Sequence, residues 1–389
     1  MKNLYQGDRG ILVSYMQLAL KRAGYPLLVD GIFGTDTCRA LADFLQTDRT
    51  PDRICVVDRS VWEKLLPYLR GYATEERENR ILFEDPVTSV EVPYTSLLTA
   101  AVIDGILARY PFLKSGEIGK SVMGKPISYL EIGNGVKEVF YNASFHANES
   151  ITTPVLLKFA EEYAQAYEKG TALYGVPAAE LFEEYRLFLV PLVNPDGVDL
   201  VNGLLTDGGY YRRAQQIASD YPVIPFPSGW KANIEGIDLN LQFPAGWENA
   251  KRIKYAQGYT KPAPRDYVGE APLTAPESEA VYAFTRSHDF KLILAYHTQG
   301  EVIYWKYLDY EPAHSYEIAQ YFGRVSGYTV EETPTQSGYA GYKDWFIQEY
   351  DRPGYTIEAG MGENPLPMSD FAGIYRDNAG ILLGGMTQI

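Results

Sequence analysis

Two histidines and two glutamates stand where they could do metal chemistry. In "YNASFHANES", residues 141–150, His146 lies three positions ahead of Glu149 and follows an apolar run. That spacing lets both side chains converge on one point from a tight turn or a helix start. His297 follows a second apolar run, "LILAY", and Glu358 follows a third, "YTI". Because the chain has only 4 histidines, two of them at the ends of apolar runs favour a functional site over coincidence.

These residue types fit zinc. A zinc ion accepts imidazole nitrogen and carboxylate oxygen at about 2 Å in a roughly tetrahedral arrangement. His146, Glu149 and His297 would fill three positions and leave the fourth open for water, whose proton Glu358 could accept. Each residue alone has a simpler interpretation: a chance pair on a loop, a satisfied core histidine, a salt-bridged glutamate. Together they predict a site for one Zn²⁺ ion.

The elements that would position these residues alternate from about residue 93 onward. The expected strands are 127–132, 138–142, 185–190, 291–296, 302–305 and 354–357, and the expected helices are 97–110, 153–168, 276–287 and 316–326. Short apolar strands separated by helices predict an α/β fold with a mixed, largely parallel sheet flanked by helices. In such sheets, sites form beyond the carboxyl ends of the strands, where His146, His297 and Glu358 are expected.

Residues 1–70 are expected to form a small all-α domain of three helices. Apolar positions at helical spacing from Leu12 to Leu20, a helix opened by Thr35 or Asp36, and a third helix across 60–69 support this. The segment resembles the peptidoglycan-binding domain in "QGDRG", "AGY", "DGIFGTDT" and "ALADFLQ". The resemblance implies cell-wall binding; a helical bundle that serves only as a spacer is the alternative. Residues 71–92, charged and poorly periodic, read as a linker or docking arm.

Composition narrows the functional class. The 389 residues suggest two domains, and a net charge of −15 argues against attraction to nucleic acid or an anionic membrane. No apolar run approaches the roughly 18 residues of a membrane span, so no membrane insertion is expected. The N-terminus has no apolar signal segment, which indicates a cytoplasmic protein or one exported without a classical signal, with cell-wall association open. Cys38 and Cys55 are expected to be reduced core cysteines, with a disulfide as the alternative.

Residues 93–389 resemble the zinc carboxypeptidases. Several motifs stand in the family's order: "GKSVMGKPISYLEIGNG", "HANE", "VPLVNPDGV", "WKANIEGIDLNLQFP", "AYHTQ", "DWF" and "YTIEAG". The resemblance implies that His146, Glu149 and His297 are the zinc ligands and that Glu358 is the general base. It also implies that Asp238 accepts the other ring N–H of His146 and fixes its tautomer.

The departures from that family concern the substrate. Leu241, after Asn240 in "GIDLNLQF", stands where the family has an arginine that grips the substrate's terminal carboxylate, and leucine cannot form that clamp. Lys231 replaces the arginine that polarises the scissile carbonyl, and its ammonium can still stabilise an oxyanion. No tyrosine stands in register with the family's mobile tyrosine, so Tyr339 and Tyr342 are candidates to replace it.

A wall-binding module joined to this altered site resembles one branch, the γ-D-glutamyl-meso-diaminopimelate peptidases of sporulating bacteria. The resemblance implies hydrolysis of the amide between γ-D-Glu and diaminopimelate in peptidoglycan stem peptides. Losing the arginine fits, because that bond need not precede a free C-terminal residue. Arg212 and Arg213 in "YYRRAQQ" could bind a substrate carboxylate or be solvated loop arginines. The alternatives are a general carboxypeptidase acting on ordinary or murein peptides and a non-catalytic cell-wall binding protein.

Overall fold

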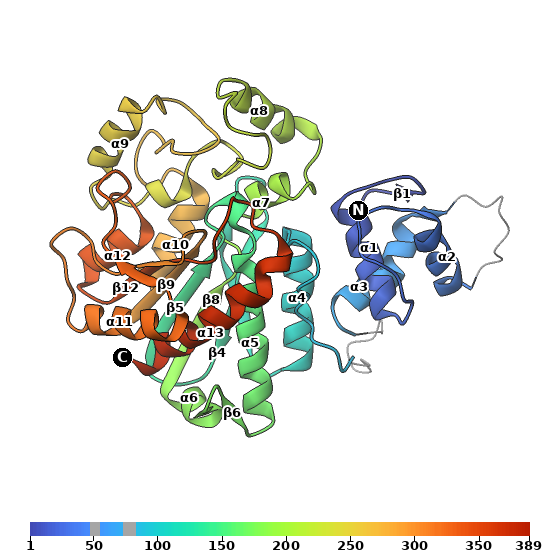
Figure 1. The fold of residues 1–389 in the computed structure, drawn as a ribbon, viewed down its shortest axis with the longest axis horizontal. Coiled ribbons are helices and arrows are strands. Elements are labelled where there is room, and N and C mark those ends of the chain that lie inside the picture. The colour runs from blue at the N-terminus through green and yellow to red at the C-terminus, as the bar shows by residue number, and fades with distance from the viewer. Residues whose placement is uncertain (47–54, 73–82) are drawn as a thin grey trace.

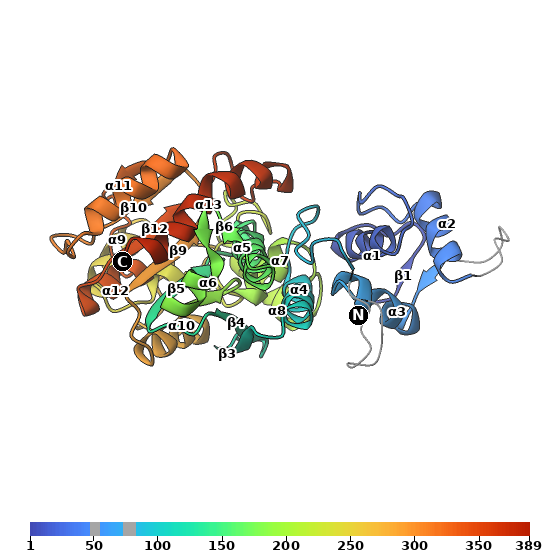
Figure 2. The same cartoon turned by 90° about the horizontal axis from the view of Figure 1, so that it is seen from below.

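The computed structural model describes residues 1–46, 55–72 and 83–389. A small N-terminal domain lies beside a larger domain built on a central sheet, and both views show the two side by side (Figures 1 and 2). None of the helices in these described stretches is long and apolar enough to cross a membrane.

The larger domain contains an eight-stranded sheet in the order β11-β10-β12-β9-β5-β8-β4-β3. Its central strands β12, β9, β5 and β8 run parallel to one another, whereas β10 pairs antiparallel with β12 and β4 pairs antiparallel with both β8 and β3. The mixed, largely parallel α/β sheet is therefore confirmed. The strands are β3 (Lys114–Lys120), β4 (Pro126–Ile132), β5 (Lys137–Ala143), β8 (Tyr185–Val190), β9 (Leu292–His297), β10 (Val302–Tyr304), β11 (Thr329–Glu331) and β12 (Gly354–Glu358).

Helices cover both faces of the sheet. Figure 2 shows α13 and α11 on one side of it and α10 on the other. Alternate side chains of β9 explain both coverings, because Leu292 and Leu294 join the hydrophobic cluster of α5 and α13, while Ile293 joins the cluster of α10 and α12. The helices are α4 (Ser96–Arg109), α5 (Thr152–Glu168), α6 (Ala178–Glu184), α7 (Pro195–Val201), α8 (Gly208–Ser219), α9 (Trp247–Ala256), α10 (Pro276–Arg286), α11 (Ser315–Ser326), α12 (Tyr342–Tyr350) and α13 (Phe371–Thr387).

The N-terminal domain contains the three expected helices, α1 (Ile11–Arg22), α2 (Thr35–Phe44) and α3 (Arg59–Leu69). Two features differ from the prediction. A short antiparallel pair, β1 (Leu4–Tyr5) with β2 (Val56–Val57), joins the N-terminal segment to the segment before α3, so the domain is not purely α-helical. Cys38 and Cys55 form a disulfide with their Cα atoms 5.7 Å apart, so the expectation of reduced cysteines is wrong.

Gln17 explains the "DGIFG" turn of this domain. Its side chain is buried on α1, and its amide nitrogen donates to Asp30 Oδ1 and Ile32 O at 2.7 and 3.1 Å. Its amide oxygen accepts from the N–H of Gly31 at 2.8 Å. Gly31 has φ 70°, a conformation that glycine adopts without strain. One buried glutamine therefore fixes the loop between α1 and α2.

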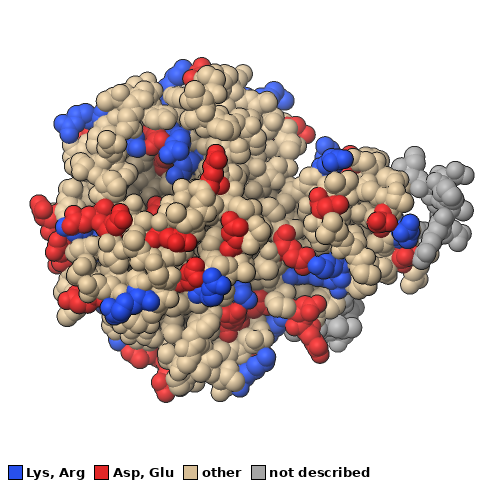
Figure 3. Space-filling model, in the orientation of Figure 1, with Lys and Arg blue, Asp and Glu red and all other residues tan. Residues whose placement is uncertain are grey.

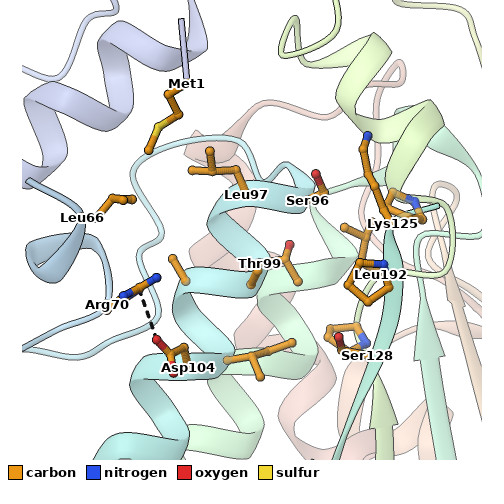
Figure 4. Close-up of a pocket in the computed structure, with 16 residues that line it drawn as sticks. Met1, Leu66, Arg70, Ser96, Leu97, Thr99, Asp104, Lys125, Ser128 and Leu192 are labelled. Carbon is orange, nitrogen blue, oxygen red and sulfur yellow. Dashed lines mark ion pairs between the residues drawn. The ribbon is translucent and has the colours of Figure 1, made fainter. Parts of the chain in front are cut away.

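The segment 83–95, which includes the end of the linker or docking arm expected over 71–92, contacts both domains, since Val87 O also accepts from Arg22 Nη2 of α1 at 2.8 Å; residues 73–82 lie outside the described residues. The buried carboxylate of Glu161 on α5 accepts the backbone N–H groups of Val87 and Thr88 at 2.7 and 2.8 Å. Arg70 and Asp104 form an ion pair of 3.2 Å between α3 and α4, beside a cavity of about 470 Å³ (Figure 4). The arm is thus held by hydrogen bonds as well as by apolar packing.

Candidate active site

Three side chains meet at the carboxyl ends of β5 and β9. His146 Nδ1 lies 3.0 Å from Glu149 Oε1, His297 Nδ1 lies 3.0 Å from Glu149 Oε2, and the two Nδ1 atoms are 3.1 Å apart. In a tetrahedral zinc site with bonds of about 2.0–2.1 Å, ligand atoms lie about 3.3 Å from one another. All three residues are buried. The arrangement therefore fits a zinc ion held by two histidines and one glutamate.

The turn after β5 presents His146 and Glu149. Ser144 has φ 54°, and its hydroxyl lies 2.8 Å from that of Thr153, which holds the chain as it leaves the strand. A short 3₁₀ turn, η2 (Ala147–Glu149), follows, and the Ala147 N–H donates to Lys231 O at 3.0 Å. The turn is therefore tied to both α5 and the segment carrying Lys231, so the convergence expected from the spacing of His146 and Glu149 has a structural cause.

Asp238 orients His146. Its Oδ1 lies 3.1 Å from His146 Nε2, which leaves Nδ1 to face the other two ligand atoms. The same carboxylate accepts the N–H groups of Asn240 and Asp266 at 3.2 and 3.1 Å. Burial alone would raise the pKa of Asp238, but the charge and hydrogen bond of His146 hold it well below its usual value. Asp238 is therefore an anionic acceptor surrounded by donors.

The charges around Lys231 favour keeping its ammonium protonated. Lys231 Nζ lies 3.1 Å from Glu149 Oε1, and its side chain is 18% exposed. Burial lowers the pKa of Lys231, but the carboxylates of Glu149, Asp238 and Glu358 together outweigh this and raise it. Burial also lowers the pKa of His146, and the carboxylates of Glu149 and Asp238 outweigh it, raising that pKa to about 9. The carboxylates of Glu149 and Asp238 therefore favour the charged forms of both basic groups beside them.

Glu358 ends β12 next to the metal ligands. It is the register partner of His297 in the parallel β12–β9 pair, and neighbouring strands lie about 4.8 Å apart. Burial raises the pKa of Glu358 to about 7, and the negative charge of Glu149 adds to the effect. A carboxylate with a pKa near neutrality can both accept and return a proton.

Two cavities open at these residues. The first, here named the Leu241 cavity, has a volume of about 190 Å³ and includes Leu241 and Asn240. The second, the Asn364 cavity, has a volume of about 550 Å³ and includes Asn364. Both are lined by Lys231 and Glu358, so the two cavities meet at the candidate catalytic residues. Figure 3 shows a hollow in the larger domain with basic and acidic side chains at its edge.

The structure does not bring all the predicted substrate residues to these cavities. Arg212 and Arg213 are exposed on α8 and line neither cavity. Tyr342 is buried in the core, with its hydroxyl 2.9 Å from that of Thr285. Tyr339 packs edge-on against Tyr307 and also lines neither cavity.

Two residues that the sequence interpretation missed line both cavities, Tyr304 and Arg265. Tyr304 ends β10 opposite Thr356 of β12. Burial raises the pKa of Tyr304, and the nearby Glu358 adds to this. The apolar run "VIYW" showed only a strand, so no signal in the sequence separated this tyrosine from a core residue. The pairing of β10 with β12 brings Tyr304 to the site.

Comparisons with known proteins agree with this geometry. A family profile described as zinc carboxypeptidase matches residues 99–379. The chain is 49% identical over 278 residues to gamma-D-glutamyl-L-diamino acid endopeptidase 1 of Lysinibacillus sphaericus, covering 71% of this chain and 68% of that protein. It is 44% identical over 334 residues to the uncharacterized protein YqgT of Bacillus subtilis, covering 81% and 87%.

Solved structures show the same fold at low sequence identity. Thrombin activatable fibrinolysis inhibitor superimposes with a TM-score of 0.61 at 17% identity, covering 78% of this chain and 77% of that one. Carboxypeptidase A of Helicoverpa armigera superimposes with a TM-score of 0.57 at 18% identity, covering 90% and 94%. At this identity the two likenesses show the fold and carry no conclusion about activity.

Proposed function

Because the chain belongs to the zinc carboxypeptidase family, we propose that it hydrolyses the amide bond between γ-D-glutamate and meso-diaminopimelate in peptidoglycan stem peptides. The observation that carries the proposal is the 49% identity to a protein named as a gamma-D-glutamyl-L-diamino acid endopeptidase. Leu241 adds support, since it lines the Leu241 cavity with an apolar side chain where a carboxylate clamp would be needed to trim free C-termini.

The chain's own groups suffice for the proton transfers. Zinc, when bound by His146, Glu149 and His297, supplies Lewis-acid chemistry that acidifies water and polarises a carbonyl. Glu358 removes the proton from the attacking water and returns it to the departing amine of diaminopimelate, a task suited to its pKa of about 7. Lys231 stabilises the negative charge that develops on the scissile carbonyl oxygen.

We also propose that the N-terminal domain holds the enzyme on peptidoglycan. Its "DGIFG" loop, fixed by Gln17, borders a cavity of about 610 Å³ that includes Tyr25 and Asp30. The Cys38–Cys55 disulfide supports action outside the reducing cytosol, at the cell wall, over the cytoplasmic alternative. Wall remodelling during sporulation is part of this proposal, because the branch that the sequence resembles implies it.

The test is direct hydrolysis. Zinc-loaded protein is incubated with L-Ala-γ-D-Glu-meso-diaminopimelate, with and without a chelator, and the products are identified by mass spectrometry. Chelator-sensitive release of diaminopimelate and L-Ala-D-Glu is the expected result. Trimming of an ordinary C-terminal peptide without cleavage of the γ-D-glutamyl bond would instead favour the general carboxypeptidase. Zinc binding with no turnover of either substrate would favour the non-catalytic wall-binding protein.

A further inference from the structure

A loop far from the metal ligands in sequence is fastened to the site at both ends. Pro264 O accepts the backbone N–H groups of Lys231 and Ala232 at 2.7 and 2.9 Å. Tyr267 O accepts the N–H of Asp238 at 2.8 Å. Two residues lie between these anchors, Arg265 and Asp266. Their backbone is therefore placed by the same residues that orient His146 and stabilise the reacting carbonyl.

The middle of this loop is conformationally strained. Asp266 has φ 65°, a left-handed conformation that a non-glycine residue adopts at a cost of about 1–3 kcal/mol. Its N–H donates to Asp238 Oδ2 at 3.1 Å. Its carboxylate contacts Lys254 Nζ at 2.5 Å and Arg265 Nε at 2.6 Å, so two cations share one carboxylate. Strain maintained by this many contacts is typical of functional sites.

Arg265 is the group that this arrangement presents. Its Nε atom is held by Asp266, whereas Nη1 and Nη2 make no hydrogen bond within residues 1–46, 55–72 and 83–389. The side chain is 44% exposed and lines both the Leu241 cavity and the Asn364 cavity. The two free nitrogens of a guanidinium form the planar fork that binds a carboxylate through two hydrogen bonds.

We propose that Arg265 binds the α-carboxylate of the γ-linked D-glutamate, and that this contact selects γ-D-glutamyl bonds over ordinary peptide bonds. The inference rests on the proposed function. In a γ-linked glutamate the α-carboxyl carbon is four bonds of about 1.5 Å from the scissile carbonyl carbon, hence within about 5 Å of it. Arg265 adjoins Lys231, the residue that faces the scissile carbonyl, through the Pro264 carbonyl. An ordinary peptide linkage carries no backbone carboxylate at that position.

Asp266 acts as a positioning residue in this scheme. It fixes the Nε side of the guanidinium and leaves the opposite side for substrate. Lys254 and Arg265 share the single carboxylate of Asp266. A substrate carboxylate would give Arg265 an acidic partner on its open side. Arg265 thus recognises the α-carboxylate of the γ-D-glutamate, whereas Leu241 cannot bind the carboxylate of a substrate C-terminus.

The experiment compares substrates and variants in pairs. The first substrate is L-Ala-γ-D-Glu-meso-diaminopimelate; the second carries a carboxamide in place of the D-glutamate α-carboxylate; the third carries L-lysine in place of diaminopimelate. The zinc-loaded full chain and the variants Arg265→Gln and Arg265→Lys are assayed for kcat/KM on each. Arg324→Gln serves as the matched control, because Arg324 is exposed on α11 and lines neither cavity.

The parent should prefer the α-carboxylate over the α-carboxamide by about 10- to 100-fold, as expected for hydrogen bonds to a charged group. Arg265→Gln should abolish that preference, Arg265→Lys should retain part of it, and Arg324→Gln should leave it intact. The proposal would be overturned if Arg265→Gln kept the parent's preference for the α-carboxylate. It would also be overturned if this variant lost only the preference for diaminopimelate over lysine. Cleavage of both D-glutamate forms at equal rates by the parent would also overturn it, although the proposed function would stand. No cleavage of any of the three would refute the proposed function and this inference with it.

Discussion

Replacing Asp238 with asparagine tests whether its carboxylate fixes the metal-binding form of His146. All three of its partners are donors: the His146 Nε2–H and the N–H groups of Asn240 and Asp266, at 3.1, 3.2 and 3.1 Å. An asparagine has one acceptor oxygen and one amino group. Whichever way the amide turns, its amino group therefore faces a donor. If the amide oxygen stays on His146, the Asp266 N–H loses its acceptor. If the oxygen turns away, His146 Nε2–H loses its acceptor.

The expected loss of zinc affinity follows from the usual effect of removing the hydrogen-bond partners of metal ligands. Losing them typically weakens metal binding by 10- to 100-fold, which corresponds to about 1.4–2.8 kcal/mol. A buried donor left without an acceptor also costs about 1–3 kcal/mol of unfolding free energy. Zinc affinity is measured by competition with a chelator, and stability by denaturation of the metal-free protein.

The matched control is Asp199→Asn. Asp199 is also buried among donors, with contacts of 2.7, 2.5 and 2.7 Å to Ser96 N–H, Ser96 Oγ and Lys125 Nζ, but it does not contact a metal ligand. Both variants should be destabilised, and only Asp238→Asn should bind zinc more weakly. Equal zinc affinity in Asp238→Asn and the parent would show that this hydrogen bond does not govern His146.

Three further changes probe the chemistry and the fold. Glu358→Gln should retain one zinc ion per chain by elemental analysis but lower kcat by about 10²- to 10⁴-fold; turnover close to that of the parent would exclude Glu358 as the base. Glu161→Ala should remove the anchor of the docking arm and lower the unfolding free energy by about 3–5 kcal/mol, as for other broken buried charge contacts, without changing zinc affinity; an unchanged melting temperature would contradict this. Burial raises the pKa of Glu277 to about 7 from 4.5, so the folded chain retains a proton that the unfolded chain has lost. The unfolding free energy should therefore fall as pH rises from 4.5 to 7, and Glu277→Gln should flatten that slope, by up to about 3 kcal/mol; an identical pH profile in the variant would argue against it.

The central strands could be predicted because both faces of each are buried, which produces uninterrupted apolar runs. Strand β8 was predicted to the residue, and β5 and β9 to within one residue at each end. The edge strand β3, "KSGEIGK", was missed because it is mostly exposed and lacks such a run. Edge strands need not be apolar, since only part of their surface is covered.

Helix α13 was missed for a different reason. Its sequence contains four glycines, which disfavour helices by about 1 kcal/mol each. The structure explains why they stand there: a Cβ atom on Gly380 would lie 2.8 Å from Val325, and one on Gly385 would collide with the Tyr141 hydroxyl. The glycines allow close packing against α11 and β5. That requirement comes from distant parts of the chain and leaves no local periodic signal.

The metal ligands are likewise marked by a local sequence pattern, whereas the substrate residues depend on distant parts of the chain. His146, His297 and Glu358 stand at the ends of buried strands, so a periodic apolar pattern marks their place and the parallel sheet brings them together. Arg212 and Arg213 were proposed as carboxylate-binding residues only because two adjacent arginines attract notice. Nothing in "PAPRDY" marks Arg265, whose position depends on hydrogen bonds from Lys231, Ala232 and Asp238 across more than 25 residues of chain.

Local sequence therefore indicates what this site can catalyse, because catalytic groups are attached to the regular elements of the sheet. It does not indicate what the site selects, because the selecting loop acquires its conformation from contacts with those groups. Leu241 illustrates the limit: its type excludes a carboxylate clamp at one position without indicating where a replacement lies. The strained backbone of Asp266, the shared anchors on Lys231 and Asp238 and the two unpartnered nitrogens of Arg265 together provide that location. They make Arg265 the position at which a change should alter substrate choice while the zinc ligands and Glu358 remain in place.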